Sequence, residues 1–340
     1  MELLKRLINE IGPSGDEAKV RNIISKTIKP WVNEIYTDSM GNLICHKKGK
    51  GEKIMLAAHM DEVALMVKQI QNNGLLKFSP IGGIAAITLI GQTVYVLKKD
   101  NQIACEGIIS FPRIHEGAAV YDLPSMDELY VDTGLSKKDV QKLGINVGSY
   151  IVPSQQFTTL GNKKIISGKA LDDRIGCYIL IELAKRIKKI NHDVYYVFTV
   201  QEEIGLYGAK TSVYNIHPHW GIAIDVTEAR DAEIRAECVL GSGPFLTMMD
   251  KEMIANKCLN DWIENIAKKE KIPLQLDVSE HGTTDATSIM LSRGGIPSTT
   301  LSVAVRNIHS TVGMSHFDDI KNAIELLYRL LKKPPKICLV

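Results

Sequence analysis

The chain has 340 residues, of which 45% are hydrophobic and 24% are charged, and its formal net charge is +2. These values are typical of a globular protein and exclude the disordered and fibrous classes. So small a charge gives no basis for a nucleic-acid partner, and no apolar run is long enough to cross a bilayer.

The N-terminal segment, residues 1–10, carries acidic and basic residues among its apolar positions, which a secretion signal would not tolerate. We therefore expect a short amphipathic helix there, a cytoplasmic protein and no membrane partner. The six cysteines form no C-x-x-C pair, so we expect them to be reduced.

A second helix is predicted to follow Glu17, because Ser14 and Glu17 have the spacing of a capping box, in which each side chain bonds the other residue's amide. Residues 35–46 read as a hairpin around a glycine-containing turn. The apolar run 54–58 then predicts a buried strand that carries His59 at its carboxyl end.

Residues 64–160 have a different pattern, with short β-type runs separated by turns and one helix-like stretch. The predicted strands are 65–70, 75–78, 88–97, 103–109 and 128–131, and the predicted helix is 136–143. This segment is predicted to form a separate, small β-rich domain.

Beyond residue 168 the chain alternates between strands and helices. The predicted strands are 194–200, 220–226, 274–278 and 298–303, and the predicted helices are 174–188, 208–214, 251–269, 285–291 and 317–331. Such alternation predicts an α/β fold with a sheet flanked by helices on both faces. The N-terminal strands would join the same sheet, so we predict a discontinuous catalytic domain, 1–63 and 161–340, into which residues 64–160 are inserted.

Histidines and acidic residues follow several of the predicted strands. They are His59, Asp61, Asp172, Asp173, Glu202, Glu203, Asp225 and His309. The carboxyl ends of strands in an open α/β sheet meet at one crevice, so these residues can share a site. Two divalent cations need about three protein ligands each, and three carboxylates with two imidazoles suffice only if one carboxylate bridges. Asp172, in the turn between a strand and a helix, is the natural bridge.

Glu202 and Glu203 would point to opposite sides of an extended backbone, so they cannot both bind one cation. One should be a ligand, and the other should take a proton from water and pass it to the leaving amine. Asp61, two residues beyond His59, can hold that imidazole in the tautomer that binds a metal.

Three segments carry a resemblance that extends over nearly the whole chain. They read AAHMDEV at 57–63, KALDDR at 169–174 and QEEIGLYGA at 201–209. The chain resembles the tetrahedral (TET) aminopeptidases, also known as glutamyl or deblocking aminopeptidases or cellulase-M-like proteins. The resemblance implies a metallopeptidase that removes N-terminal residues from peptides through a water activated by two metal ions, zinc or cobalt.

The resemblance also implies a role for each site residue. His59, Asp172 and Asp225 would hold one metal ion, and Asp172, Glu203 and His309 would hold the other. Glu202 would be the general base and Asp61 the partner of His59. The fold implied is a zinc-peptidase-like core with an inserted PDZ-like domain for dimerisation and assembly, and the oligomer implied is a tetrahedral homododecamer.

Four positions depart from the family's usual pattern. Ala64, Thr311 and Gly313 stand where glycine, proline and glutamate are usual, and Thr283 interrupts a double glycine. None of them is a predicted ligand, so we expect the metal site to be kept and the shape of the substrate pocket to differ.

Three other functions are compatible with parts of the pattern. A deacylase or amidohydrolase would use the same metal chemistry on another substrate. A glycosidase of the endoglucanase type needs two carboxyl groups and no metal, and has no use for the two histidines. A non-catalytic scaffold would not need Glu202 beside a metal. The N-terminal residue preferred by the enzyme and its native metal are left open.

Overall fold

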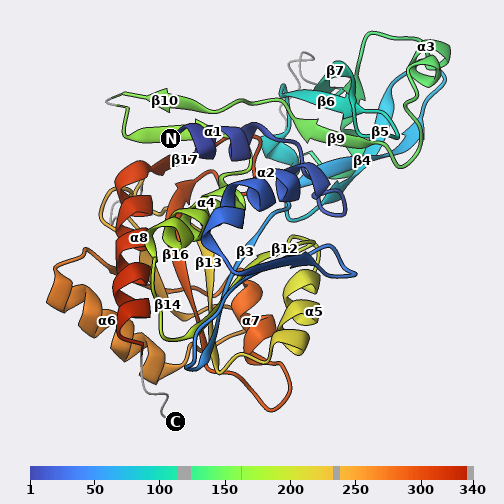
Figure 1. Cartoon of the computed structure of the whole chain (residues 1–340). Helices are drawn as coiled ribbons and strands as arrows, with labels where there is room; N and C mark the ends of the chain where they lie inside the picture. The colour runs from blue at the N-terminus through green and yellow to red at the C-terminus, as the bar shows by residue number, and fades with distance from the viewer. Residues whose placement is uncertain (113–123, 162, 233–237, 335–340) are drawn as a thin grey trace.

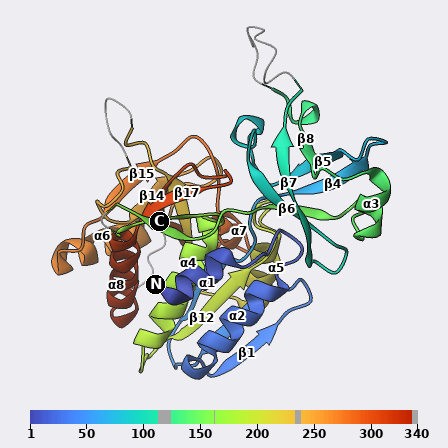
Figure 2. The same ribbon diagram turned by 90° about the horizontal axis from the view of Figure 1, so that it is seen from above.

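The computed structural model describes residues 1–112, 124–161, 163–232 and 238–334. Its strands form two systems, an eleven-stranded sheet and a closed barrel of six strands (Figure 1). The barrel stands beside the helix-covered sheet, as the view from above shows (Figure 2). No helix in these residues is long and apolar enough to cross a membrane.

The eleven-stranded sheet has the order β1-β2-β12-β3-β13-β16-β17-β11-β10, with β14 and β15 branching from β16. Its strands are β1 (Glu34–Thr37), β2 (Leu43–Lys47), β3 (Lys53–His59), β10 (Thr158–Leu160), β11 (Ile165–Gly168), β12 (Asp193–Thr199), β13 (Trp220–Glu228), β14 (Phe245–Met249), β15 (Gln275–Val278), β16 (Ser298–Arg306) and β17 (Gly313–His316). The four central strands β12, β3, β13 and β16 are parallel, so their carboxyl ends meet at one edge.

Helices cover both faces of this sheet. One face carries α1 (Glu2–Asn9), α2 (Ala18–Ile28), α4 (Leu171–Arg186), α6 (Lys257–Glu270) and α8 (Phe317–Lys332), and the other carries α5 (Tyr207–Ile216) and α7 (Asp285–Met290) (Figure 1). The inner residues of β3, 54–58, and of β13, 220–224, carry no polar side chain, as expected of strands that are buried on both sides. The predicted α/β class, a mixed sheet between helices, is confirmed.

The barrel has the strand order β4-β5-β8-β7-β6-β9 and encloses its own apolar core. Its elements are β4 (Ala64–Ile70), β5 (Leu76–Ile81), β6 (Thr93–Leu97), β7 (Ile103–Ser110), β8 (Tyr130–Asp132), α3 (Lys137–Lys142) and β9 (Tyr150–Pro153). The barrel ends at Pro153, since β10 pairs with β11 in the large sheet. Because β4 follows the carboxyl end of β3 within five residues, the barrel stands over the edge where the parallel strands end.

The predicted capping box does not form. The Ser14 hydroxyl donates to Asp61 Oδ2 at 2.6 Å, and Glu17 Oε1 accepts from the amides of Gly15 and Gln201. Helix α2 begins at Ala18 without a side-chain cap. A buried carboxylate far along the chain competes for the hydroxyl that the local pattern assigned to the helix.

Three further expectations need correction. Helix α6 begins at Lys257 and not at residue 251, because Asp250 Oδ1 accepts two nearby amides in a turn and Asn256 caps the helix. The short strands β9, β10, β14 and β17 were not predicted. Four of the cysteines form no disulfide bond, but Cys258 is disulfide-bonded, and Cys338 lies outside the described residues.

Candidate active site

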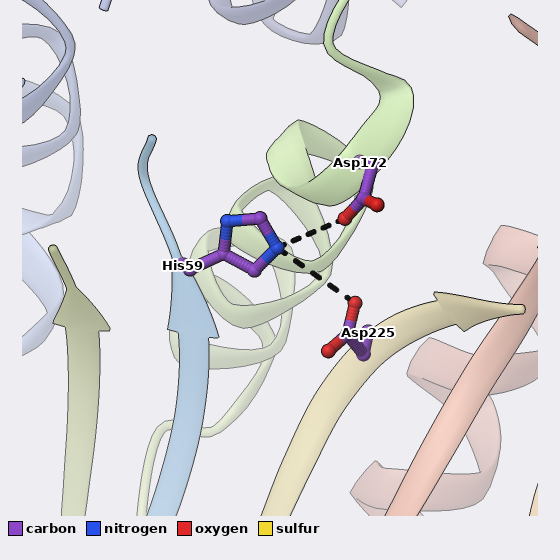
Figure 3. Close-up of side chains that lie close together, drawn as sticks. All are labelled: His59, Asp172 and Asp225. Carbon is purple, nitrogen blue, oxygen red and sulfur yellow. Dashed lines mark hydrogen bonds and ion pairs between the residues drawn. The ribbon is translucent and has the colours of Figure 1, made fainter. Parts of the chain in front are cut away.

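Three of the predicted ligands meet at the carboxyl edge of the parallel strands (Figure 3). His59 is the last residue of β3, Asp225 lies in β13, and Asp172 lies at the start of α4. The His59 Nε2 atom lies 2.9 Å from Asp172 Oδ1 and 3.9 Å from Asp225 Oδ1. We call these three residues the His59 group.

A second group forms on the other side of Asp172. His309 follows β16 in a loop, and its Nε2 atom lies 3.2 Å from Asp172 Oδ2 and 3.4 Å from Glu203 Oε2. We call Asp172, Glu203 and His309 the His309 group. In each group one ligand atom per residue lies within 4.8 Å of the others, which is close enough to surround one metal ion.

Asp172 belongs to both groups and presents one carboxylate oxygen to each. Burial alone would raise its pKa, but hydrogen bonds to His309 and His59 lower it. A carboxylate that remains ionised between two imidazoles is the arrangement expected of a ligand shared by two cations.

The chemistry of the donors fits divalent cations. Burial raises the pKa of Glu203 to about 8 and that of Asp225 to about 8, because negative charges are crowded together away from water. Glu203 Oε1 is buried and accepts no hydrogen bond from the residues that the structure describes. Burial would lower the pKa of His309, yet its bond to Asp172 raises it to about 9. With three carboxylates and two imidazoles, the set carries an excess of negative charge, which metal ions would offset.

Glu202 lies beside both groups but belongs to neither. Its Oε2 atom lies 4.0 Å from His59 Nε2, and burial, with the charge of Asp225, raises its pKa well above the usual value. The two glutamates were expected to diverge because they would follow one another in an extended strand. They diverge in a turn instead, in which Gln201 has φ +53° and the amides of Gly205 and Leu206 donate to the Glu202 carbonyl.

Asp61 contacts both His59 and the turn that carries Glu202 and Glu203. Its carbonyl oxygen lies 3.2 Å from His59 Nδ1 and its Oδ1 atom 3.5 Å from the same nitrogen. The carboxylate also accepts from the backbone amides of Glu202 and Glu203, at 3.1 and 3.2 Å, and from the Ser14 hydroxyl. The sequence pointed to the contact with His59 but not to the amides or to Ser14.

A buried ion network beneath the site was also missed. Glu62, the residue after Asp61, accepts from Lys169 Nζ at 2.7 and 2.8 Å and from the Gly12 amide at 2.9 Å. Arg174 donates to four carbonyl oxygens, among them that of Met60 at 2.8 Å. This network ties the end of β3 to the segment that carries Asp172. The sequence did offer a clue to this network, since its charged residues lie within the motifs that contain the ligands.

The four positions that depart from the family pattern leave the ligands in place. Thr311 is buried and donates to Gln92 Oε1 in the barrel at 3.0 Å, and Gly313 opens β17 beside Gly168. Thr283 shares a hydrogen bond with Thr287 in α7. Ala64 is fully buried at the start of β4.

A cavity of about 650 Å³ opens next to the two groups. It is lined by the ligands, by Glu202 and by Gly83, a glycine from the barrel at which a Cβ atom would lie 3.0 Å from His309 Nδ1. Thr247, Asp250 and Asp277 are also among its walls. The ligand groups therefore line a space that can hold a side chain.

Comparison with known proteins accounts for this arrangement. Residues 41–326 match the M42 glutamyl aminopeptidase family. The chain belongs to that family. A lysyl aminopeptidase of Pyrococcus furiosus is 35% identical over 98% of this chain and 96% of its own. This M42 peptidase is therefore a peptide hydrolase of the metal-dependent aminopeptidase class.

Solved structures show the same likeness. An aminopeptidase of the archaeon Desulfurococcus kamchatkensis superposes with a TM-score of 0.94 at 37% identity, covering 98% of this chain and 94% of its own. The TET1 peptidase of Pyrococcus horikoshii, which can assemble into a tetrahedron or a large octahedral shell, has a TM-score of 0.86 at 30% identity, covering 98% and 99%. The expected resemblance to the TET aminopeptidases is confirmed.

Proposed function

We propose that this M42 peptidase removes N-terminal residues from peptides with two divalent cations that share Asp172, and with Glu202 as the general base. The observation that carries the proposal is the position of the Asp172 carboxylate, whose Oδ1 faces His59 and whose Oδ2 faces His309. Asp225 and Glu203 complete the two groups.

When bound, such cations supply Lewis acidity, which polarises a carbonyl group and lowers the pKa of water. Glu202 takes the proton of the attacking water at its carboxylate and delivers it to the departing amine. Its buried position suits this work, since a raised pKa makes the carboxylate a stronger base for the proton of the water. Asp61 holds the His59 ring and the Glu202 amide, so it positions both a ligand and the base.

The mixture of two imidazoles and three carboxylates favours zinc or cobalt, because magnesium and calcium bind mainly oxygen ligands. We propose zinc or cobalt as the cations of both groups.

We further propose a catalytic domain of residues 1–63 with 161–340 and an inserted, PDZ-like assembly domain within residues 64–160, the last strand of which, β10, returns to the large sheet. Support comes from the separate apolar core of the barrel. The likeness to a TET1 peptidase that assembles into closed shells supports a homo-oligomer, with a tetrahedral dodecamer as the form proposed.

Chelation tests the proposal. The protein should hydrolyse aminoacyl p-nitroanilides, lose this activity after dialysis against EDTA, and regain it with added zinc or cobalt. A glycosidase would instead cleave a soluble cellulose derivative and keep that activity in EDTA.

A substitution of the proposed general base distinguishes an enzyme from a non-catalytic scaffold. Glu202→Gln should lower kcat by about 10²- to 10⁴-fold, the usual contribution of a general base, while the metal content stays that of the wild type. An unchanged kcat would remove Glu202 from the mechanism.

A further inference from the structure

The barrel reaches the His309 group through segment 82–92, which joins β5 to β6. At Gly82 a Cβ atom would lie 3.2 Å from Glu203 Oε2, and at Gly83 it would lie 3.0 Å from His309 Nδ1. Both distances are shorter than ordinary van der Waals contact, so the backbone of this segment lies directly against the two side chains. The barrel therefore forms a wall for two of the three ligands of the His309 group.

A hydrogen bond ties the end of the same segment to the loop that carries His309. The Thr311 hydroxyl donates to Gln92 Oε1 at 3.0 Å, and Thr311 is only 2% exposed. Gln92 is fixed by its backbone, because its amide donates to the Leu89 carbonyl at 3.1 Å and its carbonyl accepts from the Ile109 amide at 2.9 Å. Two residues beyond His309, the loop is thus held by a side chain whose own position is set by the barrel.

The two imidazoles differ in what orients the ring nitrogen that faces away from the ligand group. His59 Nδ1 lies 3.2 Å from the Asp61 carbonyl oxygen. His309 Nδ1 has no hydrogen-bond partner among the residues that the structure describes, and it faces Gly83. An acceptor at this nitrogen normally fixes the ring of a histidine that binds a metal. Without one, the direction of the His309 ring depends on the position of its loop.

The loop is held on both sides of His309. Before it, Glu228 at the end of β13 accepts from the amides of Asn307 and Ile308, at 3.3 and 3.0 Å. Beyond it, Gln92 holds Thr311. Between these contacts His309 has φ +52°, a left-handed conformation that is uncommon for a residue other than glycine. Loss of the contact with Gln92 would release one side of a loop whose backbone is strained at the ligand.

We propose that Gln92 is a positioning residue for the His309 group, because it holds the His309 loop through Thr311. The affinity of this group for its cation then depends on the barrel, and that of the His59 group does not. The inference rests on the two cations of the proposed function. Within the described part of the chain Gln92 does not line the cavity, so it acts through the loop and not on the substrate.

Removing either partner of the hydrogen bond tests the inference. Gln92→Leu leaves the buried Thr311 hydroxyl without an acceptor, and Thr311→Val removes the donor. In the zinc-loaded protein each variant should bind one cation about 10-fold more weakly, within the usual effect of losing a contact that orients a metal ligand, and should bind the other as the wild type does. The double variant should lose no more affinity than either single one, since both changes break the same contact.

Competition with a chromophoric chelator measures the two dissociation constants, and His309→Ala identifies which of them belongs to the His309 group. Cobalt gives a second readout. The visible absorption bands that appear with the cation of the His309 group should shift in Gln92→Leu, and the bands of the other cation should not.

Three variants separate positioning from a general loss of structure. Thr311→Ser keeps a hydroxyl and should bind both cations as the wild type does. Gln92→Glu keeps an acceptor of the same reach and should bind them at least as tightly. Gln69→Leu makes the same change as Gln92→Leu at an exposed position of β4 and should change neither dissociation constant.

The outcomes distinguish this inference from the proposed function. Two bound cations whose affinities are unchanged in Gln92→Leu and Thr311→Val, or are weakened equally, would overturn the inference and leave the aminopeptidase standing. Losses that add up in the double variant would overturn it too. A cation whose affinity depends on Gln92 in a protein that hydrolyses no aminoacyl p-nitroanilide would uphold the inference and reject the proposed reaction. Fewer than two cations in the wild type would reject both.

Discussion

The two ligand groups share Asp172 but are held by the fold in different ways. His59 is the last residue of a central strand and its side chain is 2% exposed, whereas His309 lies in a loop with φ +52° and its side chain is 38% exposed. The carboxylates differ likewise, since Asp225 lies within β13 and Glu203 in a turn. The His59 group is thus part of the sheet, and the His309 group is assembled from loops. We expect the cation of the His309 group to be the more easily removed.

The largest effect is expected where the two groups meet. Asp172→Asn removes the charge that both groups share, so we expect less than one bound cation per chain and a loss of kcat of about 10³-fold or more. Metal analysis and kinetics on the same sample measure both quantities. Two retained cations in this variant would contradict a shared ligand.

The next largest effect is expected for the buried ion pair between Glu62 and Lys169, which lies beneath the His59 group. Glu62→Gln leaves Lys169 buried without its carboxylate, and breaking such a pair costs about 3 to 5 kcal/mol of stability. Urea denaturation measures the change. Asp261→Asn, which breaks the exposed pair with Lys257, is the matched control and should cost less than about 1 kcal/mol. Equal losses of stability in the two variants would show that the buried pair contributes no more to stability than an exposed one.

Removing each histidine compares the groups directly. His309→Ala should lose one cation and keep the other, with an affinity for the lost cation weaker by about 10- to 100-fold. His59→Ala should destabilise the fold as well, because it opens a cavity at the end of a buried strand. Titration with a competing chelator reports the two affinities. Loss of both cations from the wild type at the same chelator concentration would contradict the claim that the His309 group holds its cation less tightly than the His59 group.

A smaller effect is the pH dependence of stability that we expect from Glu17, which contacts the turn that carries Glu202 and Glu203. Burial, with the charge of Asp61, raises the pKa of Glu17 to about 7 from 4.5, and Glu17 accepts from the amide of Gln201, just before Glu202. Between these two pH values the native state holds a proton that the unfolded state has lost, so the free energy of unfolding should fall as pH rises from about 4.5 to about 7 and stay level above. The fall should be about 3 kcal/mol.

Glu17→Gln keeps an acceptor for the amides but cannot ionise. Relative to the wild type, the variant should gain about 2.5 kcal/mol in stability between pH 5 and pH 8, as measured by urea denaturation at each pH. A difference that does not change with pH would show that Glu17 has an ordinary pKa in the native protein.

The sequence was most informative about the ligands. Metal binding restricts each position to a few residue types, and the ends of parallel strands bring these positions together whatever the details of packing. The His59 and His309 groups could therefore be anticipated from the residues and the family resemblance. The positions of the large strands β3, β12, β13 and β16 along the chain followed from their apolar runs, but their order in the sheet was not predicted.

The supporting contacts could not be anticipated, because they depend on tertiary structure. Ser14 reaches Asp61 across 47 residues of sequence, and Lys169 reaches Glu62 across 107. The local pattern around Ser14 even favoured a different partner. Strands such as β10 and β14 have three to five residues, too few for a periodic pattern to identify.

Anomalous diffraction from zinc-loaded crystals tests the shared carboxylate most directly. We predict two peaks per chain, about 3.5–4 Å apart, with one Asp172 oxygen directed at each. A single peak, or two peaks of which only one lies within bonding distance of Asp172, would contradict the account.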